Sequence, residues 1–183
     1  MKKKHIFIIL GIVIVIGIVI GGVFTYNHHK KQKQAELKQQ EQLEKSETYF
    51  FEYLQETVAK IEKQMESSYS LCTDVANQLK KYGEAKTFYS VYNSYYIRSS
   101  HSDVKTRMET LDIIKPKSNK YQTEHEKIIE LYNSYKDIFD IGMTVPNSSY
   151  EDYAYTIAKE KAEYNKILEE VRKIIPKKEE SKY

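Results

Sequence analysis

The first strong pattern along the chain is an uninterrupted apolar run near the N-terminus. Every residue from Ile6 to Phe24 is Ile, Val, Leu, Phe or Gly. At about 1.5 Å per residue, a helix of this length can cross the roughly 30 Å of hydrocarbon in a bilayer. A secretory signal peptide would have a shorter apolar region followed by a cleavage site of small residues, and the sequence has neither. The pattern predicts a retained transmembrane anchor over 6–26, after a cytoplasmic tail of residues 1–5.

Positive charges flank the predicted anchor on both sides. They are Lys2, Lys3 and Lys4 before it, and Lys30, Lys31 and Lys33 after it. A short tail that carries three lysines is easier to keep inside the cell than to translocate. We therefore expect a single-pass protein of the cell membrane, with its N-terminus in the cytoplasm and its C-terminal domain extracytoplasmic.

Small residues recur every four positions within the predicted anchor, at Gly17, Gly21 and Thr25. Such a face lets a second helix approach closely in the membrane. Over these nine residues the pattern is similar to the transmembrane dimer motif of glycophorin. The resemblance implies self-association into a homodimer through this face. The alternative is that glycine is simply common in membrane helices.

A polar segment, 27–48, follows the anchor. Leu37 and Leu43 are its only large aliphatic residues, and it contains no Gly or Pro that would end a helix. The segment is expected to be a helical stalk.

Beyond the stalk, apolar residues recur with a seven-residue spacing that is typical of a helix buried along one seam. The two interleaved series are Phe51, Val58, Met65, Cys72 and Leu79, and Leu54, Ile61, Ser68, Val75 and Tyr82. Gly83 supplies a helix stop. The pattern predicts a helix of about 33 residues, roughly 50 Å long, which needs partners to cover its apolar seam.

Two more long helices have recognisable ends. Pro116 suits the first position of a helix, and the apolar spacing after it runs to a glycine stop at Gly142. Ser148 and Glu151 form a capping-box pattern before a last helix that ends at Pro176. These two helices are expected to form an antiparallel hairpin on the first.

The segment between Glu84 and Ile114 has a weaker pattern, which indicates short helices that make a crossover. Its apolar residues are Phe88, Val91, Tyr92 and Tyr95 in one group and Val104, Met108 and Leu111 in another. No stretch shows sustained strand alternation. The sequence therefore predicts an all-α protein with a three-long-helix antiparallel bundle over 49–175. A charged, disordered tail is expected over 176–183.

Charge and cysteine content narrow the class of partner. The chain has 29 Lys and Arg and 26 Asp and Glu, but six of the lysines lie in the first 33 residues, which contain no acidic residue. The remaining 23 basic residues face 26 acidic ones, so the domain is mildly acidic and we expect no nucleic-acid partner. The N-terminal lysines belong instead with lipid headgroups of the bilayer.

Cys72 is the only cysteine, so no intramolecular disulfide can form, and its place on the seam suggests core packing. Cysteine pairing across a dimer is the other option.

Catalytic and metal motifs are absent from the sequence. His125 and Glu126 begin like a zincin helix, but that motif needs a second histidine where Ile129 stands. The acidic residues on the later helices suit solvated faces better than acid–base chemistry; they are Glu124, Glu126, Asp137 and Asp140. There is no glycine-rich phosphate loop and no nucleophile elbow. The sequence predicts neither enzymatic activity, nor a metal site, nor a cofactor.

The densest candidate for a contact surface is a group of tyrosines beside one arginine. Its members are Tyr89, Tyr92, Tyr95, Tyr96 and Arg98. Tyrosine combines a large contact area with a hydroxyl group and is enriched where proteins bind partners. The alternative is that tyrosine replaces leucine throughout the chain, which contains 17 Tyr and no Trp. Such a composition is typical of an AT-rich bacterial genome.

These patterns favour a non-enzymatic interaction protein of the bacterial cell envelope, whose membrane-anchored helical bundle binds another envelope protein. One concrete form would be an immunity or phage-exclusion role. The alternative function is a module that binds a cell-wall polymer through surface tyrosines.

Overall fold

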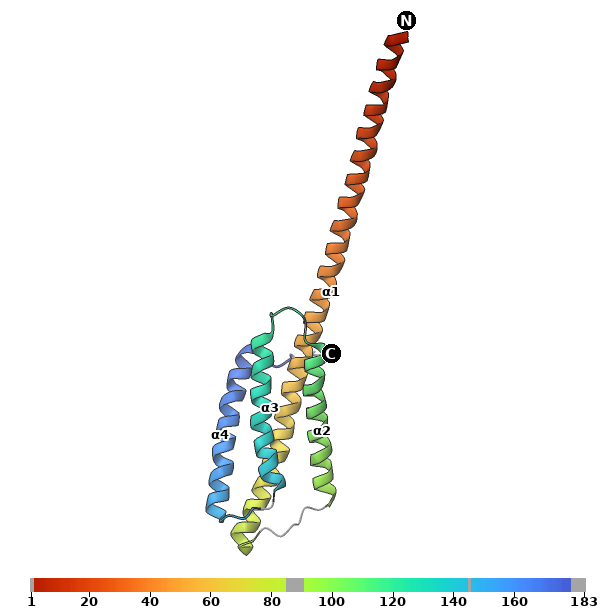
Figure 1. The fold of residues 1–183 in the computed structure, drawn as a ribbon. Helices are drawn as coiled ribbons and strands as arrows, with labels where there is room; N and C mark the ends of the chain where they lie inside the picture. The colour runs from red at the N-terminus through yellow and green to blue at the C-terminus, as the bar shows by residue number, and fades with distance from the viewer. Residues whose placement is uncertain (1, 85–90, 145, 179–183) are drawn as a thin grey trace, which may run out of the picture. The chain divides into compact units, whose positions relative to one another are not determined.

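The computed structural model describes the backbone of residues 2–84, 91–144 and 146–178, and the side chains of 31–84, 96–144 and 146–178. These residues form helices and no strand, which confirms the prediction of an all-α protein (Figure 1). The helices are α1 (Lys2–Tyr82), α2 (Val91–Ile114), α3 (Gln122–Met143) and α4 (Tyr150–Ile174). The chain divides into two compact units, residues 1–46 and 47–183, which are described separately.

The first unit consists of the N-terminal part of α1. The predicted anchor, including Gly17, Gly21 and Thr25, lies outside the residues whose side chains are described, so it stays a prediction. From residue 31 to 46 every side chain is exposed, including those of Leu37 and Leu43. Among the side chains that are described, no helix combines the length and apolar character needed to cross a membrane.

The second unit is a bundle of four helices, in which each helix runs antiparallel to the next (Figure 1). The prediction of three long helices with short crossover helices is therefore wrong in one respect. Residues 91–114 form one helix of 24 residues, α2, which is a full member of the bundle. Among the residues of α2 whose side chains are described, the buried apolar ones are Val104, Met108 and Leu111 in its C-terminal half, a spacing that by itself is typical of a short helix.

The seam of α1 forms the centre of the bundle core. Leu54, Val58, Ile61 and Cys72 are completely buried, as the seven-residue spacing predicted. Burying an aliphatic side chain of this size contributes about 1.5–3 kcal/mol. The first predicted position, Phe51, is only half-buried. Near the C-terminus of α1, the buried seam ends between the last two predicted positions. Leu79 is buried, whereas Tyr82 is exposed. Gly83 ends α1 as predicted, with φ +71° and its N–H donating to Leu79 O at 2.9 Å.

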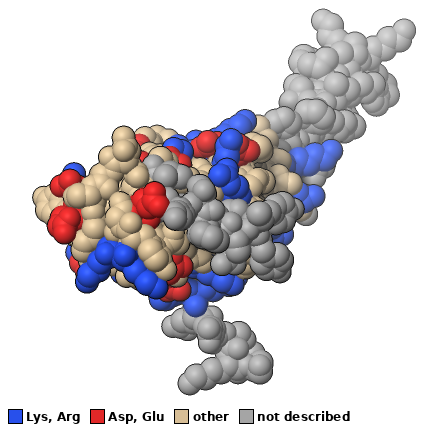
Figure 2. Space-filling view, turned by 90° about the horizontal axis from the view of Figure 1, so that it is seen from below, with Lys and Arg blue, Asp and Glu red and all other residues tan. Residues whose placement is uncertain are grey.

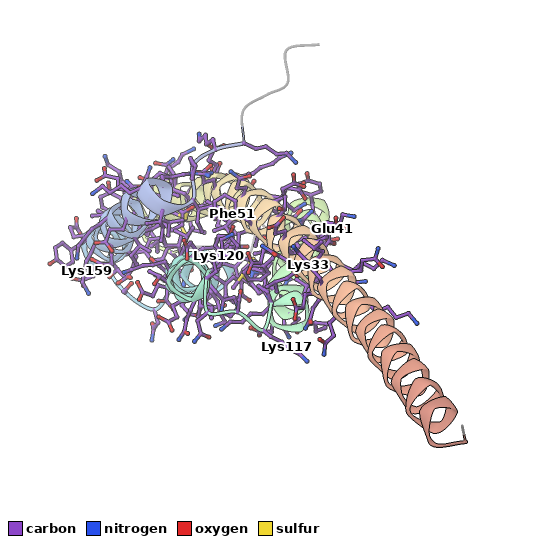
Figure 3. All side chains as sticks on the ribbon, turned by 90° about the horizontal axis from the view of Figure 1, so that it is seen from above. Lys33, Glu41, Phe51, Lys117, Lys120 and Lys159 are labelled. Carbon is purple, nitrogen blue, oxygen red and sulfur yellow. The ribbon has the colours of Figure 1, made fainter. Side chains whose placement is uncertain are left out.

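The α2–α3 loop, which includes Lys117 and Lys120 (Figure 3), is joined to Glu47 of α1. The Ser118 hydroxyl and the Lys120 ammonium donate to the two carboxylate oxygens of Glu47, at 2.7 and 2.8 Å. Both hydrogen bonds lower the pKa of the Glu47 carboxyl group, and the one from Lys120 has the larger effect. They also hold residues 115–121 as a loop, and α3 begins only at Gln122. The prediction that Pro116 opens this helix is therefore wrong.

The turn between α3 and α4 corrects two further expectations. Gly142 does not stop α3 but lies inside it, where a Cβ atom would meet Cys72 Sγ at 3.0 Å and Leu71 Cδ2 at 3.3 Å. The glycine is explained by this close approach of α1 and α3. The cap of α4 is Ser149 rather than Ser148, because Ser149 has the extended backbone and its hydroxyl accepts from the Asp152 N–H at 3.1 Å.

The segment after α4 returns along α1. Gln55 Nε2 donates to Pro176 O at 3.0 Å, and Lys178 lies 3.7 Å from Glu56. Residues 176–178 of the predicted disordered tail therefore contact the bundle, and 179–183 lie outside the described residues.

Candidate functional site

The structure describes only part of the predicted tyrosine cluster. Tyr89 lies outside the described residues, and Tyr92 and Tyr95 belong to α2 but their side chains are not described. Tyr96 is 57% exposed, and Arg98 is also exposed. The candidate contact surface therefore has to be built from Tyr96 and from what lies next to it.

A groove runs beside Tyr96, between α1 and α2. Its volume is ≈ 380 Å³, and its walls are Glu66, Ser67 and Ser70 of α1 and Tyr96 and Ile97 of α2. The two serines are small side chains on the α1 wall of this groove. A partner could pack closely here against the Tyr96 ring.

A second groove lies on the other side of α1, against α4. Its volume is ≈ 470 Å³. Its lining residues are Glu62, Met65, Glu66 and Tyr69 from α1, Lys161, Tyr164, Asn165 and Leu168 from α4, and Lys177 from the C-terminal segment. This groove combines an apolar floor with a polar rim, which is the usual composition of a small-ligand site.

Glu66 lines both grooves and so stands on the ridge of α1 between them. We call this surface the Glu66 face, made of Glu66, Ser67, Tyr69 and Ser70 of α1 with Tyr96 of α2. The Glu66 side chain is exposed and makes no ion pair among the described residues. The face therefore offers an available carboxylate with one tyrosine on each side.

Two interactions fix the α4 wall of the second groove. Lys161 Nζ lies 3.3 Å from the centre of the Tyr69 ring. Arg172 holds Glu62 at two points, with Nε donating to Oε1 at 2.8 Å and Nη2 lying 2.7 Å from Oε2. Because both pairs join α1 to α4, the groove is a preformed feature of the bundle.

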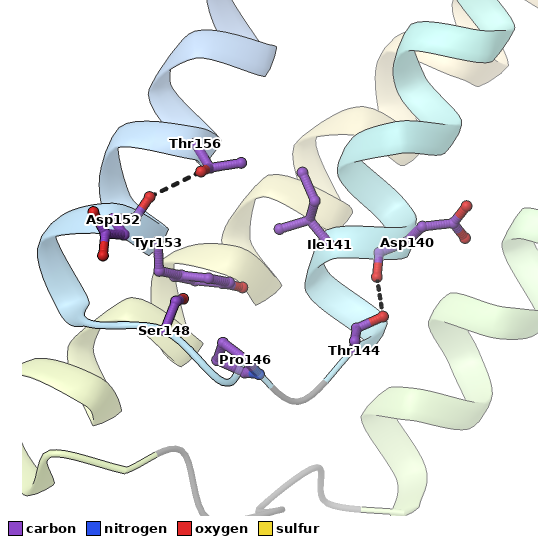
Figure 4. A pocket seen from close by; sticks show the side chains of 8 residues that line it. All are labelled: Asp140, Ile141, Thr144, Pro146, Ser148, Asp152, Tyr153 and Thr156. Atoms are coloured by element: carbon purple, nitrogen blue, oxygen red, sulfur yellow. Dashed lines mark hydrogen bonds between the residues drawn. The ribbon is translucent and has the colours of Figure 1, made fainter.

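A third cavity, of ≈ 390 Å³, lies at the α3–α4 turn between Asp140, Pro146 and Tyr153 (Figure 4). Its threonine hydroxyls are already used, because Thr144 donates to Asp140 O and Thr156 donates to Asp152 O. Asp140 is paired with Lys136 at 2.6 Å. Asp140 and the two threonines of this cavity are therefore already engaged within α3 and α4.

The two histidines of the bundle serve in packing. His101 stacks on Phe139 with 3.9 Å between ring centres, and its Nδ1 lies 3.0 Å from the Tyr135 hydroxyl. Burial lowers the pKa of His101. His125 is buried against Phe50, with Nε2 3.0 Å from an Asp112 oxygen. Within the described ranges, no three His, Cys, Asp or Glu side chains come together in a way that could hold a metal ion.

Cys72 occupies the core, as the seam pattern suggested. Its thiol donates to Ile138 O at 3.4 Å, and burial raises its pKa to about 11. A protonated, enclosed thiol of this kind is unreactive and cannot reach a second copy of the chain.

The sequence pattern missed the α4 side of the surface. Tyr164 and Leu168 lie within the last predicted helix, and Tyr164 is buried, at 2% exposure. Only the fold places these residues, with Lys161 and Asn165, opposite Tyr69 of α1. No local pattern in the sequence indicates that α4 lies opposite Tyr69.

Acidic and basic side chains are interspersed on the face of the bundle seen in Figure 2, without a large area of one sign. This distribution suits a protein that recognises a partner through local contacts rather than through a broad field. Comparison with known proteins adds no relative, because no family model, no curated protein and no solved structure matches the chain.

Proposed function

We propose that this chain is a non-enzymatic, membrane-anchored interaction protein of the bacterial cell envelope, whose bundle binds another envelope protein through the Glu66 face. The anchor is the apolar run Ile6 to Phe24, and the three lysines that precede it favour an extracytoplasmic bundle. The bundle itself supplies a preformed surface and needs no chemistry for this role.

The observation that carries the proposal is the arrangement around Glu66. An exposed carboxylate stands on the ridge of α1, and a groove on each side leads to a tyrosine, Tyr96 on α2 or Tyr69 on α1 itself. Tyrosine is one of the residues that are enriched at the energetic centre of a protein interface. The exposed Tyr96 ring provides contact area without a large loss of side-chain entropy.

The chemistry of the face favours a partner segment that carries a lysine or arginine next to apolar side chains. The cation would pair with Glu66, and the apolar groups would enter the groove beside Tyr96 and Ile97. A second copy of this chain fits less well. A two-fold interface uses the same patch on both molecules, and one centred on this ridge would bring Glu66 against Glu66.

Photocrosslinking in cells tests the proposal. A photoreactive phenylalanine analogue replaces Tyr96, and a matched chain carries it instead of Tyr155, which is 72% exposed on α4 but lies outside both grooves. We expect a discrete adduct from position 96 and not from position 155.

Charge reversal at the same face supplies the specificity control. Glu66→Lys should reduce the adduct from position 96 by about tenfold, which corresponds to ~1.4 kcal/mol. Glu169→Lys reverses another exposed glutamate, on α4, and should leave the adduct intact. Equal adducts from positions 96 and 155, or an adduct that is insensitive to Glu66→Lys, would contradict the proposal.

A further inference from the structure

The segment after α4 crosses α1 from the side of α4 to the side of α2. On the α4 side, Lys177 Nζ lies 3.9 Å from Glu62, which lines the α1–α4 groove. On the α2 side, Lys178 Nζ lies 3.7 Å from Glu56. Arg107 of α2 pairs with the same glutamate at 3.6 Å. The chain therefore leaves the described part of the bundle on the α2 side of α1.

The stripe of α1 that begins at Glu56 leads to the α1–α2 groove. An α-helix has about 3.6 residues per turn, so Lys63 and Ser67 lie about two and three turns beyond Glu56 on the same side of the helix. Ser67 belongs to the α1 wall of the groove. At about 1.5 Å per residue, it is roughly 16 Å from Glu56 along the helix axis. A segment that continues from Lys178 along this stripe arrives at the groove.

The residues that follow Lys178 can cover this distance. They are Glu179, Glu180, Ser181, Lys182 and Tyr183, and they lie outside the described residues. An extended chain advances about 3.3 Å per residue, so a segment of this length spans roughly 16 Å. Tyr183 is therefore within reach of the groove.

The first charges of this segment are complementary to the first charge that it would meet. Lys178 is already placed at Glu56, and two acidic residues follow it, Glu179 and Glu180. The next charged group on the stripe is Lys63, which is exposed and has no ion pair among the described residues. A segment that follows the stripe brings opposite charges together here.

The end of the segment has the chemistry that the Glu66 face favours in a partner. Lys182 is followed by Tyr183, so a cation stands next to an aromatic ring. Glu66 is the available carboxylate of the face, and the groove beside Tyr96 and Ile97 accepts the ring. The order of charges along the segment therefore matches the order along α1 as far as the groove.

We propose that residues 179–183 dock along α1 and cover the Glu66 face, so that this segment competes with the envelope partner for the same surface. The competition rests on the proposed function, whereas the docking itself requires no partner. A short tether gives the segment an effective concentration in the millimolar range, so that weak contacts suffice to occupy the face. The partner binds when it displaces the segment.

Intramolecular photocrosslinking of the purified full-length protein in detergent tests the docking. A photoreactive phenylalanine analogue replaces Tyr183, and mass spectrometry of the monomeric product identifies the residues that it reaches. We expect crosslinks to the walls of the α1–α2 groove, at 66–70 and 96–97. Crosslinks spread over the whole bundle, or none within it, would overturn the proposal.

An exchange of charges supplies the matched control. Lys182→Glu should reduce the crosslink to the groove by about three- to fivefold, the effect of one exposed ion pair. Adding Glu66→Lys should restore the crosslink, because the pair is then present with its charges reversed. Adding Glu169→Lys, on α4, should not restore it. A crosslink that is insensitive to Lys182→Glu, or that Glu66→Lys does not restore, would contradict the docking.

Crosslinking in cells tests the competition. A segment that covers the face half of the time halves the apparent affinity of the partner, so a chain that ends at Lys178 should give about twice the adduct from position 96. An adduct that is unchanged or smaller would overturn the competition. Absence of the intramolecular crosslink with an intact adduct from position 96 contradicts the docking alone. An intramolecular crosslink without any adduct from position 96, even in the shortened chain, contradicts the proposed function alone.

Discussion

The close contact between α1 and α3 at Gly142 gives a sharp prediction for this residue. A Cβ atom at this position would lie 3.0 Å from Cys72 Sγ and 3.3 Å from Leu71 Cδ2. The sulfur has little freedom to move, because Cys72 is completely buried and its thiol is bonded to Ile138 O on α3. Gly142→Ala should therefore push the two helices apart or displace the thiol.

Two opposing effects determine how much Gly142→Ala changes the free energy of unfolding. Alanine is favoured over glycine inside a helix by about 0.5–1 kcal/mol. Forcing an extra methyl group into a packed core costs about 1–3 kcal/mol. Because the sulfur cannot retreat, we expect the packing cost to exceed the helix gain, and Gly142→Ala to be about 1 kcal/mol less stable than the wild type.

A double-mutant cycle in urea isolates the contact. Cys72→Ala removes the sulfur, so Gly142→Ala in that background should recover the helix gain and become stabilising by about 0.5 kcal/mol. The coupling between the two positions would then be about 1.5 kcal/mol. Gly142→Ala that stabilises the wild type, or that has the same effect in both backgrounds, would show that the helices are not packed as described.

Two further predictions concern charged and titratable groups of the bundle. Burial lowers the pKa of His101 below its usual 6.5, so the folded state binds this proton less readily than the unfolded state and loses stability as the pH falls through 6.5. The unfolding free energy of the wild type minus that of His101→Gln should therefore decrease between pH 8 and pH 5, and a difference that is constant or grows would refute this. Arg172→Met removes the two-point contact with the partly buried Glu62 and should cost about 1–3 kcal/mol in urea unfolding. Lys159→Met, at an exposed lysine of the same helix, should change stability by less than about 0.5 kcal/mol, and equal effects of the two substitutions would contradict the role of Arg172.

The long helices of the bundle could be predicted because each buries one continuous stripe. The seam of α1 has a regular seven-residue spacing, and α3 has a comparable stripe through Ile128, Leu131, Tyr135 and Ile138. A regular stripe of this kind is the strongest secondary-structure signal in a sequence.

The sequence did not predict α2 as one long helix, because the apolar stripe of this helix is incomplete. Its middle contains Ser99, Ser100, His101 and Ser102, which are polar and only moderate helix formers. In the fold, Ser100 is buried and His101 stacks on Phe139, so tertiary packing completes the side that the pattern leaves open. Histidine is not counted as an apolar residue, so a histidine that packs by stacking on an aromatic ring does not appear in the hydrophobic spacing.

The errors at helix ends have local causes. Gly142 could serve either as a helix stop or as a point of close helix approach, and only the position of Cys72 decides between the two. Ser148 and Ser149 are both competent caps, and the backbone of the turn selects the second. Pro116 would suit a helix start, but the bonds from Ser118 and Lys120 to Glu47 keep its segment in a loop.

Only the local part of the candidate site could be predicted, because the rest depends on how the helices pair. Tyr96 stood out as a member of a local cluster, whereas Tyr69, Lys161 and Tyr164 are far apart in the sequence. Their meeting in one groove depends on the pairing of α1 with α4, which no local pattern encodes.

The proposed function requires that the bundle is displayed outside the cytoplasmic membrane, where an envelope partner can reach the Glu66 face. The direct measurement is protease treatment of intact, wall-stripped cells that express the chain with an epitope tag after Tyr183, followed by blotting for the tag. A bundle outside the membrane should lose the tag in intact cells while a cytoplasmic control protein survives. Protection of the tag in intact cells, with cleavage only after lysis, would place the bundle in the cytoplasm and contradict the proposed function.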